Sequence, residues 1–182
     1  MKKKLNNKGF TLIELLAVVV ILAVVMGIAM TSVLSSMNNS RKGSLSNSAE
    51  STAQIFQNKY AEAMVTGSTS AVFGKYDFTA GTTTFYPLIK GVASDLNLSD
   101  KAYSLTTGET ATGTATAPTT SFVAFNGEKI VACLIANNSG SYYVGQAAVS
   151  ADAGKTVSIL GTDVTFAKGT MFACSDEQNS WE

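Results

Sequence analysis

The sequence predicts an α+β fold in which one long N-terminal α-helix packs on an antiparallel β-sheet. Apolar residues dominate from Phe10 to Met30 and then recur at helical spacing as far as Met64. Short apolar segments separated by turn-forming residues follow after residue 120. A helix with one apolar stripe and a sheet with one apolar face can bury each other, which predicts one layer of each.

The first predicted element is a hydrophobic helix over residues 10–37, suited to cross a membrane and to assemble with other helices. Phe10–Met30 contains one charged residue, Glu14, and one glycine, Gly27. As a helix this stretch spans about 30 Å, the thickness of the hydrocarbon of a bilayer. The lysines before it should remain in the cytoplasm; they are Lys2, Lys3, Lys4 and Lys8. A secretory signal peptide is the alternative, but its apolar stretch would be shorter and followed by a small-residue cleavage site.

Glu14 is the unusual residue of this helix. A carboxylate near the end of a lipid-spanning helix costs on the order of 2–3 kcal/mol, so an acid there is a functional hypothesis by default. Nothing near it in the sequence is expected to pair with it in the bilayer. If the chain were cut between Gly9 and Phe10, the new amino group of Phe10 would lie one helical turn away. A neighbouring copy could offer its own amine, and such a buried pair needs good geometry.

The front of the chain resembles the class III signal of type IV pilins in the stretch Lys8-Gly9-Phe10-Thr11-Leu12-Ile13-Glu14. The two agree at the basic leader, the glycine before the cut, the phenylalanine that becomes the new amino terminus, and the glutamate five places into the mature chain. The resemblance implies the type IV pilin fold and a leader over residues 1–9, which a prepilin peptidase removes on the cytoplasmic side. It also implies that the same enzyme methylates the Phe10 amine. Many pilins carry a proline that lets the helix unwind in the filament, whereas no proline lies between Phe10 and Met64 here.

The resemblance also implies a function. The chain looks like a major pilin of clostridia and similar Gram-positive bacteria, a subunit of an extracellular type IV pilus that serves adhesion, aggregation or twitching motility. Its implied partners are other copies of itself, the prepilin peptidase and methyltransferase, the assembly platform and minor pilins. The precursor would reside in the inner (cytoplasmic) membrane before it enters the surface fibre. The alternatives are a pseudopilin of a type II secretion or DNA-uptake system, and a membrane-anchored extracellular enzyme or receptor domain.

An amphipathic half of the helix is predicted over residues 38–66. Its apolar positions recur at spacings of three and four, which is one stripe of a helix; they are Leu45, Ala49, Ala53, Phe56, Tyr60 and Met64. We expect this stripe to pack on the sheet, and Gly67 to end the helix. Two helices broken around Asn38-Asn39 and Gly43 are the alternative.

The remaining residues, 67–182, are predicted to form a globular head with an antiparallel sheet. The Asn126-Gly127 pair is a favoured hairpin turn because both residues accept positive φ. Three strands are expected as a meander over Phe122–Phe125, Ile130–Ala136 and Tyr142–Val149, with weaker candidates at 155–160 and 164–166. A short helix is expected over 88–98, and a surface loop or loose edge strand over 106–120.

The two cysteines, Cys133 and Cys174, lie 41 residues apart in the chain. The resemblance implies a disulfide, because pilins often close a C-terminal loop in this way, and an extracellular location permits one. A loop of this length would be stabilised by about 4 kcal/mol in the chain-entropy estimate. Two thiols buried as small apolar groups are the alternative.

Composition argues against most other chemistry. The chain has no histidine, so the commonest general base and the commonest zinc ligand are missing. Its net charge of zero argues against a nucleic-acid partner. The cysteine spacing excludes a metal knuckle or a redox CxxC motif. We therefore expect no catalytic, cofactor or metal site.

Overall fold

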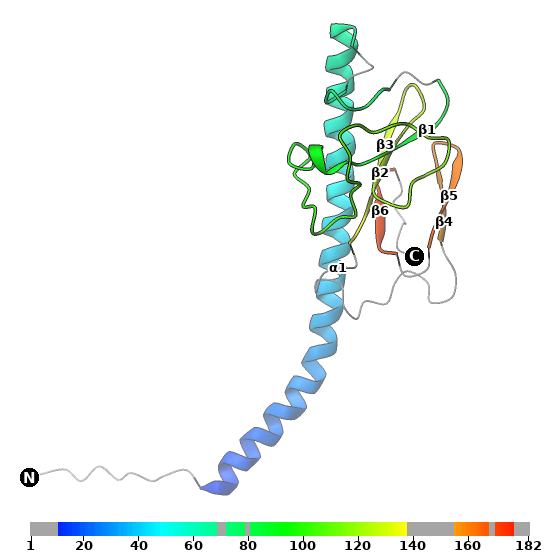
Figure 1. The fold of residues 1–182 in the computed structure, drawn as a ribbon. Coiled ribbons are helices and arrows are strands. Elements are labelled where there is room, and N and C mark those ends of the chain that lie inside the picture. The colour runs from blue at the N-terminus through cyan, green and yellow to red at the C-terminus, as the bar shows by residue number, and fades with distance from the viewer. Residues whose placement is uncertain (1–10, 69–71, 79–80, 138–154, 168–169, 177–182) are drawn as a thin grey trace, which may run out of the picture. The chain divides into compact units, whose positions relative to one another are not determined.

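The computed structural model describes residues 11–68, 72–78, 81–137, 155–167 and 170–176 (Figure 1). These residues form helix α1, the 3-10 turn η2 and six strands: α1 (Leu12–Thr66), β1 (Thr84–Pro87), η2 (Lys90–Val92), β2 (Phe122–Phe125), β3 (Ile130–Ile135), β4 (Lys155–Ile159), β5 (Thr162–Phe166) and β6 (Phe172–Cys174). The chain divides into two compact units, Met1–Ser40 and Arg41–Glu182, and the second is called the head unit below. Helix α1 begins in the first unit and ends in the head unit.

Helix α1 is continuous and ends at a glycine cap. It has no break at Asn38-Asn39 or Gly43, so the alternative of two helices is wrong. Gly67 follows the last helical residue with φ +71°, a conformation that glycine adopts without a steric cost. The N–H of Ser68 donates to the carbonyl oxygen of Ala63 (2.9 Å), and that of Gly67 to Met64 (3.3 Å). This is the Schellman pattern that satisfies the last carbonyls of a helix.

The apolar stripe of α1 packs on the sheet, with one error in its predicted register. The first four stripe residues, Leu45 to Phe56, are buried, and Tyr60 is partly buried. Met64 is 59% exposed, and Ala63 takes the buried position instead. Five helical turns take about 18 residues, so Ala63 lies directly below Leu45, whereas Met64 has rotated by about 100° toward solvent.

The main sheet is antiparallel with the order β1-β2-β3-β6. The predicted strands at 122–125 and 130–136 are confirmed as β2 and β3, paired in the register Phe122↔Cys133 to Phe125↔Ile130. The third predicted strand, Tyr142–Val149, lies outside the described residues. The neighbour of β3 is β6, which the sequence did not predict because three residues carry no period-2 pattern.

The main sheet has an apolar core on each face. On β2, Val123 and Phe125 join the core that contains the α1 stripe, whereas Phe122 and Ala124 join a second core with residues of β4 and β5. Because both faces are covered, β2 and β3 are buried along their whole length.

The cover of the second face is the β4–β5 hairpin, which Figure 1 shows on the side of the sheet away from α1. Its turn residues, Leu160 and Gly161, both have positive φ (50° and 79°), as a type I′ hairpin turn requires. The weaker candidate strands are therefore confirmed. The α+β class is also confirmed, but the fold has three layers where the sequence predicted two.

The predicted short helix over 88–98 is reduced to η2. The N–H of Leu88 donates to the carbonyl oxygen of Ser121 (2.7 Å), which keeps the start of this segment extended. Asn97 then adopts φ +54°, which is incompatible with a continuing helix. Between these two constraints too few residues remain for a stable α-helix.

The segment 106–120 runs irregularly along the outer edge of β1. Phe85 and Thr114 exchange two backbone hydrogen bonds (2.8 and 2.9 Å), so the segment covers part of an edge that would otherwise be open to pairing. Gly113 allows this approach. A Cβ atom at residue 113 would lie 2.7 Å from Cε1 of Tyr86, closer than two carbon atoms can pack.

Aromatic side chains fix the segment 72–78 on α1. Phe56 meets Phe73 and Tyr76 edge-to-face, with ring centroids 5.1 and 5.0 Å apart, a geometry that aromatic pairs prefer. Burial raises the pKa of Tyr76 to about 12, so its hydroxyl is neutral at physiological pH. That hydroxyl accepts the N–H of Ile89 (3.2 Å) inside the core.

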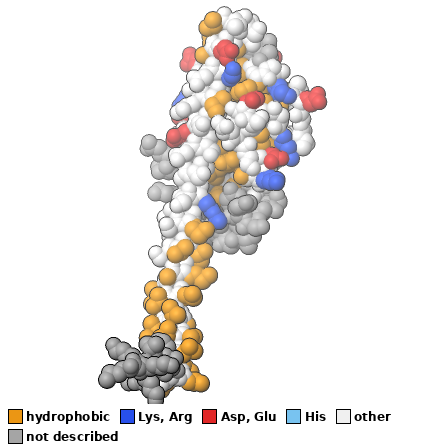
Figure 2. Space-filling view, turned by 90° about the vertical axis from the view of Figure 1, so that its left-hand side faces the viewer, with side chains coloured by type: hydrophobic (Ala, Val, Ile, Leu, Met, Phe, Trp, Pro, Cys, Tyr) orange, Lys and Arg blue, Asp and Glu red, His pale blue; other side chains and the backbone are white. Residues whose placement is uncertain are grey.

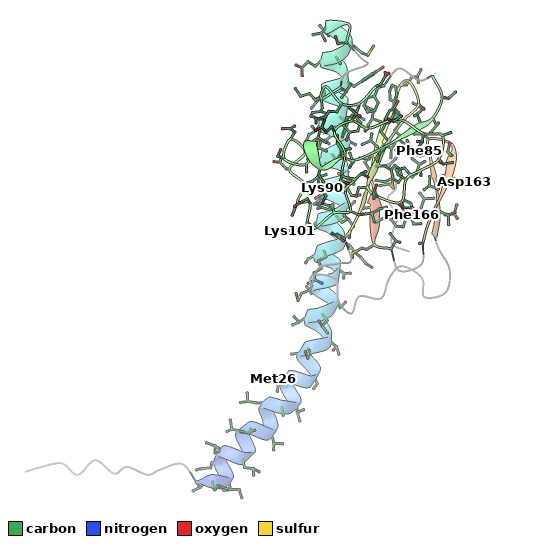
Figure 3. The ribbon with its side chains drawn as sticks, in the orientation of Figure 1. Met26, Phe85, Lys90, Lys101, Asp163 and Phe166 are labelled. Atoms are coloured by element: carbon green, nitrogen blue, oxygen red, sulfur yellow. A yellow bond between two sulfur atoms is a disulfide. The ribbon has the colours of Figure 1, made fainter. Side chains whose placement is uncertain are left out.

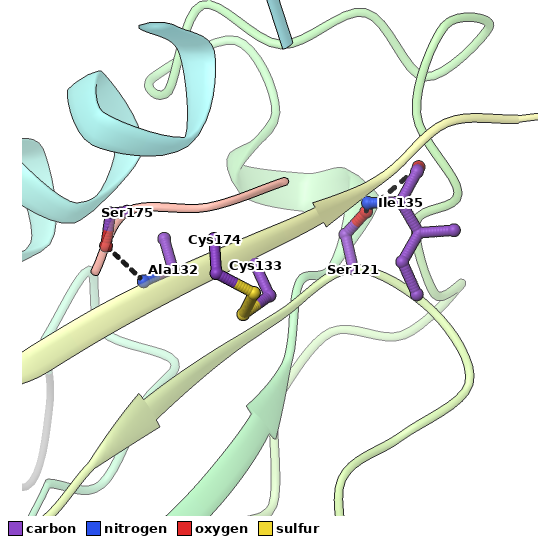
Figure 4. The surroundings of a disulfide bond; sticks show 6 residues. All are labelled: Ser121, Ala132, Cys133, Ile135, Cys174 and Ser175. Atoms are coloured by element: carbon purple, nitrogen blue, oxygen red, sulfur yellow. Dashed lines mark hydrogen bonds between the residues drawn. A yellow bond between two sulfur atoms is a disulfide. The ribbon is translucent and has the colours of Figure 1, made fainter. Parts of the chain in front are cut away.

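Cys133 and Cys174 form a disulfide across β3 and β6 (Figure 4). The two residues are directly opposite in the strand register, with their Cα atoms 4.1 Å apart. Both side chains are buried in the second core. Beyond the disulfide, Ser175 continues the pairing, because its hydroxyl accepts the N–H of Ala132 (3.1 Å). Of the two alternatives that the sequence left open, the structure has the disulfide.

We predict that replacing both cysteines (Cys133→Ala with Cys174→Ala) lowers the free energy of unfolding by about 4 kcal/mol, because the unfolded chain regains the entropy of an open loop. Urea unfolding of the detergent-solubilised chain measures this loss. The wild-type chain under reducing conditions is the matched control and should lose a similar amount. Equal stability of the oxidised, reduced and substituted chains would contradict the prediction.

We also predict that Gly113→Ala destabilises the head unit by about 1–3 kcal/mol, because the added methyl group forces the segment off β1 or displaces the Tyr86 ring. Gly108→Ala is the control. A Cβ there meets its nearest neighbour, the carbonyl oxygen of Thr110, at an ordinary 3.7 Å. The same urea titration should separate the two variants, and equal midpoints would show that the close approach is unimportant.

Candidate assembly site

The N-terminal part of α1 exposes apolar side chains on every side. Its large apolar residues, from Leu12 to Met37, are between 46% and 83% exposed. Four successive residues, Val18 to Ile21, cover a full turn and are each more than half exposed. Figure 2 shows hydrophobic side chains gathered over this part of the helix, and Figure 3 shows Met26 among them. A helix of this kind is suited to lipid or to a bundle of other helices, since it has no polar face for water.

Its length and composition suit a membrane. An 18-residue window of α1 reaches a mean hydropathy of 3.0, enough for a helix to cross a bilayer. From Leu12 to Ser40 the sequence contains one charged residue, Glu14. At about 1.5 Å per residue, Leu12–Met30 spans roughly 28 Å, close to the thickness of the hydrocarbon core.

Glu14 lies in the first turn of α1, where its carboxylate caps the helix. Oε2 accepts the backbone N–H of Thr11 and its hydroxyl, both at 2.8 Å. The Thr11 hydroxyl oxygen in turn lies 3.4 Å from the N–H of Glu14. This reciprocal arrangement is a capping box, which satisfies N–H groups that have no partner within the helix. A negative charge at this end is also favoured by the helix dipole.

The capping box corrects one premise of the sequence analysis. Glu14 does have a partner nearby in the chain, namely Thr11. The pattern Thr-x-x-Glu before an apolar run predicts this contact, so it was readable from the sequence. Both hydrogen bonds fall on Oε2, and Oε1 has none among the bonds between described residues. One carboxylate oxygen therefore remains for a further donor.

Of the other predicted site residues, the structure brings Cys133 and Cys174 together as the disulfide. Gly9 and Phe10 lie outside the described residues, so the expected pairing of Glu14 with the Phe10 amine stays a prediction. Cys133 and Cys174 belong to the core of the head unit. Within the described ranges, no three side chains of Asp, Glu, Cys or His lie close enough to hold a metal ion.

Residues 4–30 match a family described as the prokaryotic N-terminal methylation motif. This motif is the leader signature of type IV pilins and pseudopilins, so the chain carries the signature that its first residues resemble. The match covers residues 4–9 of the expected leader and the whole apolar stretch Phe10–Met30 with Glu14, and it does not extend to the head unit. No curated protein and no solved structure matches the chain.

We predict that Thr11→Val weakens the first turn of α1 by about 1 kcal/mol, because valine keeps the shape of threonine but loses the capping hydroxyl. Amide hydrogen exchange of the full chain in micelles should show Leu15 exchanging about fivefold faster, the equivalent of that loss. Thr11→Ser retains the hydroxyl and should exchange like the wild type. Identical exchange in both variants would mean that the box contributes nothing to the helix start.

Proposed function

We propose that the chain is a structural subunit of an extracellular type IV pilus, and that it polymerises through the N-terminal part of α1. One observation carries the proposal. The N-terminal part of α1 is apolar on every side and has its single charge, Glu14, in the first turn, within a segment that matches the methylation motif. A simple membrane anchor has no need of a carboxylate at that place.

Processing would create the cationic partner of Glu14. A prepilin peptidase cuts between Gly9 and Phe10, and the amine of Phe10, which the same enzyme methylates, becomes the new chain end. This amine is four residues from Glu14, which is one helical turn. Before the cut, residue 10 has a neutral peptide N–H. Cleavage therefore supplies the positive charge at the time when assembly needs it.

Glu14 of one subunit would then pair with the Phe10 amine of the next. Oε2 is held by Thr11, whereas Oε1 has no bond among the described residues and is available to an ammonium group. In the apolar interior of a helical bundle, an unpaired charge of either sign is costly, and pairing removes both costs. Only one axial offset between neighbouring helices brings the two charges together, so this contact would set the subunit register.

The head unit would form the surface of the fibre. Most of its described apolar residues belong to two cores, and the N-terminal part of α1 is left as the surface for assembly. Adhesion, aggregation and twitching motility would be properties of the fibre, with the assembly platform and minor pilins as further partners. Before assembly the precursor resides in the cytoplasmic membrane, with its lysine-rich leader inside.

We predict that Glu14→Ala leaves leader cleavage intact but strongly reduces the yield of sheared surface fibres, because the Phe10 amine loses its partner. Glu50→Ala is the matched control, since it removes an exposed acid from the same helix within the head unit. Immunoblots of the sheared fraction and of the membranes measure the yield and the cleavage. Normal fibre yield from Glu14→Ala would refute the pairing.

Three further measurements test the proposal as a whole. Gly9→Val should block the cut and leave the precursor in the membrane, and a processed product from that variant would count against the cut site.

The mass of the chain from sheared fibres should correspond to residues 10–182 with one added methyl group and the disulfide. A pseudopilin would instead show a processed chain without long surface fibres, so electron microscopy of intact cells separates the two functions.

A further inference from the structure

The turn between β2 and β3 has an unusual arrangement around a side-chain amide. The strand register ends at Phe125↔Ile130, so residues 126–129 form the turn. Oδ1 of Asn126 accepts two backbone N–H groups, those of Glu128 (3.1 Å) and Lys129 (2.8 Å). Gly127 lies between Asn126 and these two donors in the chain, and its own N–H takes part in none of the hydrogen bonds between described residues.

We propose that Asn126 is a site of spontaneous deamidation, in which the chain modifies itself without an enzyme. The backbone nitrogen of Gly127 loses its proton to solvent and attacks Cγ of Asn126. A new C–N bond forms, the bond from Cγ to the side-chain nitrogen breaks, and ammonia leaves after taking up a proton from water. Water then opens the resulting five-membered succinimide at either carbonyl, which gives aspartate or isoaspartate at residue 126.

Three features of the turn favour this reaction. Attack on Cγ develops negative charge on Oδ1, and the two N–H donors already point at that atom, as donors do in an oxyanion hole. Gly127 has no side chain to hinder its nitrogen, and its φ of +98° is one that other residues rarely adopt. Asn126 and Gly127 are both partly exposed, so that water can accept the proton and open the ring.

The product changes the charge at one edge of the head unit. The new carboxylate lies three residues before Lys129. Lys129 precedes β3 and pairs with Asp176, which follows β6, at 2.5 Å. Lys129 and Asp176 line a groove of about 280 Å³ together with Glu50 and Gln54. Deamidation adds a negative charge beside this groove and offers Lys129 a second acidic partner. The aspartate form keeps an acceptor oxygen for both N–H donors, so the turn remains intact.

The test follows residue 126 in the intact, folded chain. The detergent-solubilised protein is incubated in mildly alkaline buffer, and peptide mass spectrometry measures the amide-to-acid mass change at each asparagine. We expect Asn126 to convert at least about tenfold faster than Asn97, because glycine leaves the attacking nitrogen unhindered and the two donors stabilise the developing oxyanion. Asn97 is the internal control, because it precedes Leu98 rather than a glycine.

The same chain unfolded in urea supplies the reference rate of the free sequence. If the unfolded chain converts residue 126 while the folded chain keeps its amide, the turn protects the amide and the proposal is overturned. Failure of both forms to convert overturns it equally. Asn126→Gln should abolish the change at this position, because the five-membered ring cannot form, and a persisting mass gain there would assign the reaction to another residue. None of these outcomes depends on how the subunits assemble.

Discussion

A helix that is apolar around its whole circumference cannot remain single in water, and this constraint dominates the chain. Burial is worth about 25 cal/mol per Å² of apolar surface, so the exposed side chains from Leu12 to Met37 require lipid or other helices. The part of α1 within the head unit must also bury its apolar side chains. There one stripe is apolar, and the sheet of the same chain covers it. A single continuous helix thus joins a segment that needs a foreign environment to one that the chain satisfies itself.

Much of the fold was predictable because two local patterns were strong. The spacing of Leu45, Ala49, Ala53 and Phe56 identified the buried face of the helix, and Asn126-Gly127 identified the β2–β3 hairpin. The failures have physical causes. Two successive steps of four residues, from Phe56 to Tyr60 and on to Met64, exceed the 3.6-residue period of the helix, which misplaced the last stripe residue. Strand β6 is too short to have a pattern of its own, and it exists through its pairing with β3. The third layer was missed because the unbroken apolar runs of β2 and β3 indicate burial on both faces without showing which segment covers the second face.

The candidate site was also predictable from the sequence only in part. The apolar stretch and its isolated acid stand out in the sequence, and the methylation motif covers both. The bond between Thr11 and Glu14 was also predictable from the sequence, since Thr-x-x-Glu before an apolar run is the pattern of a capping box. The sequence of one chain does not predict a contact between two copies of it. Neither periodicity nor capping specifies which neighbouring helix a carboxylate will meet.

The bond between Cys133 and Cys174 turns the 40 residues between them into a covalent ring. A protease that cuts the backbone once anywhere within that ring releases no fragment, because the two new ends stay tied through sulfur. The β4–β5 hairpin lies inside the ring, so a single nick leaves this cover attached at its place over the second core. The head unit thereby keeps its second cover through a first cleavage, whereas the same cleavage would leave an open chain in two separate pieces.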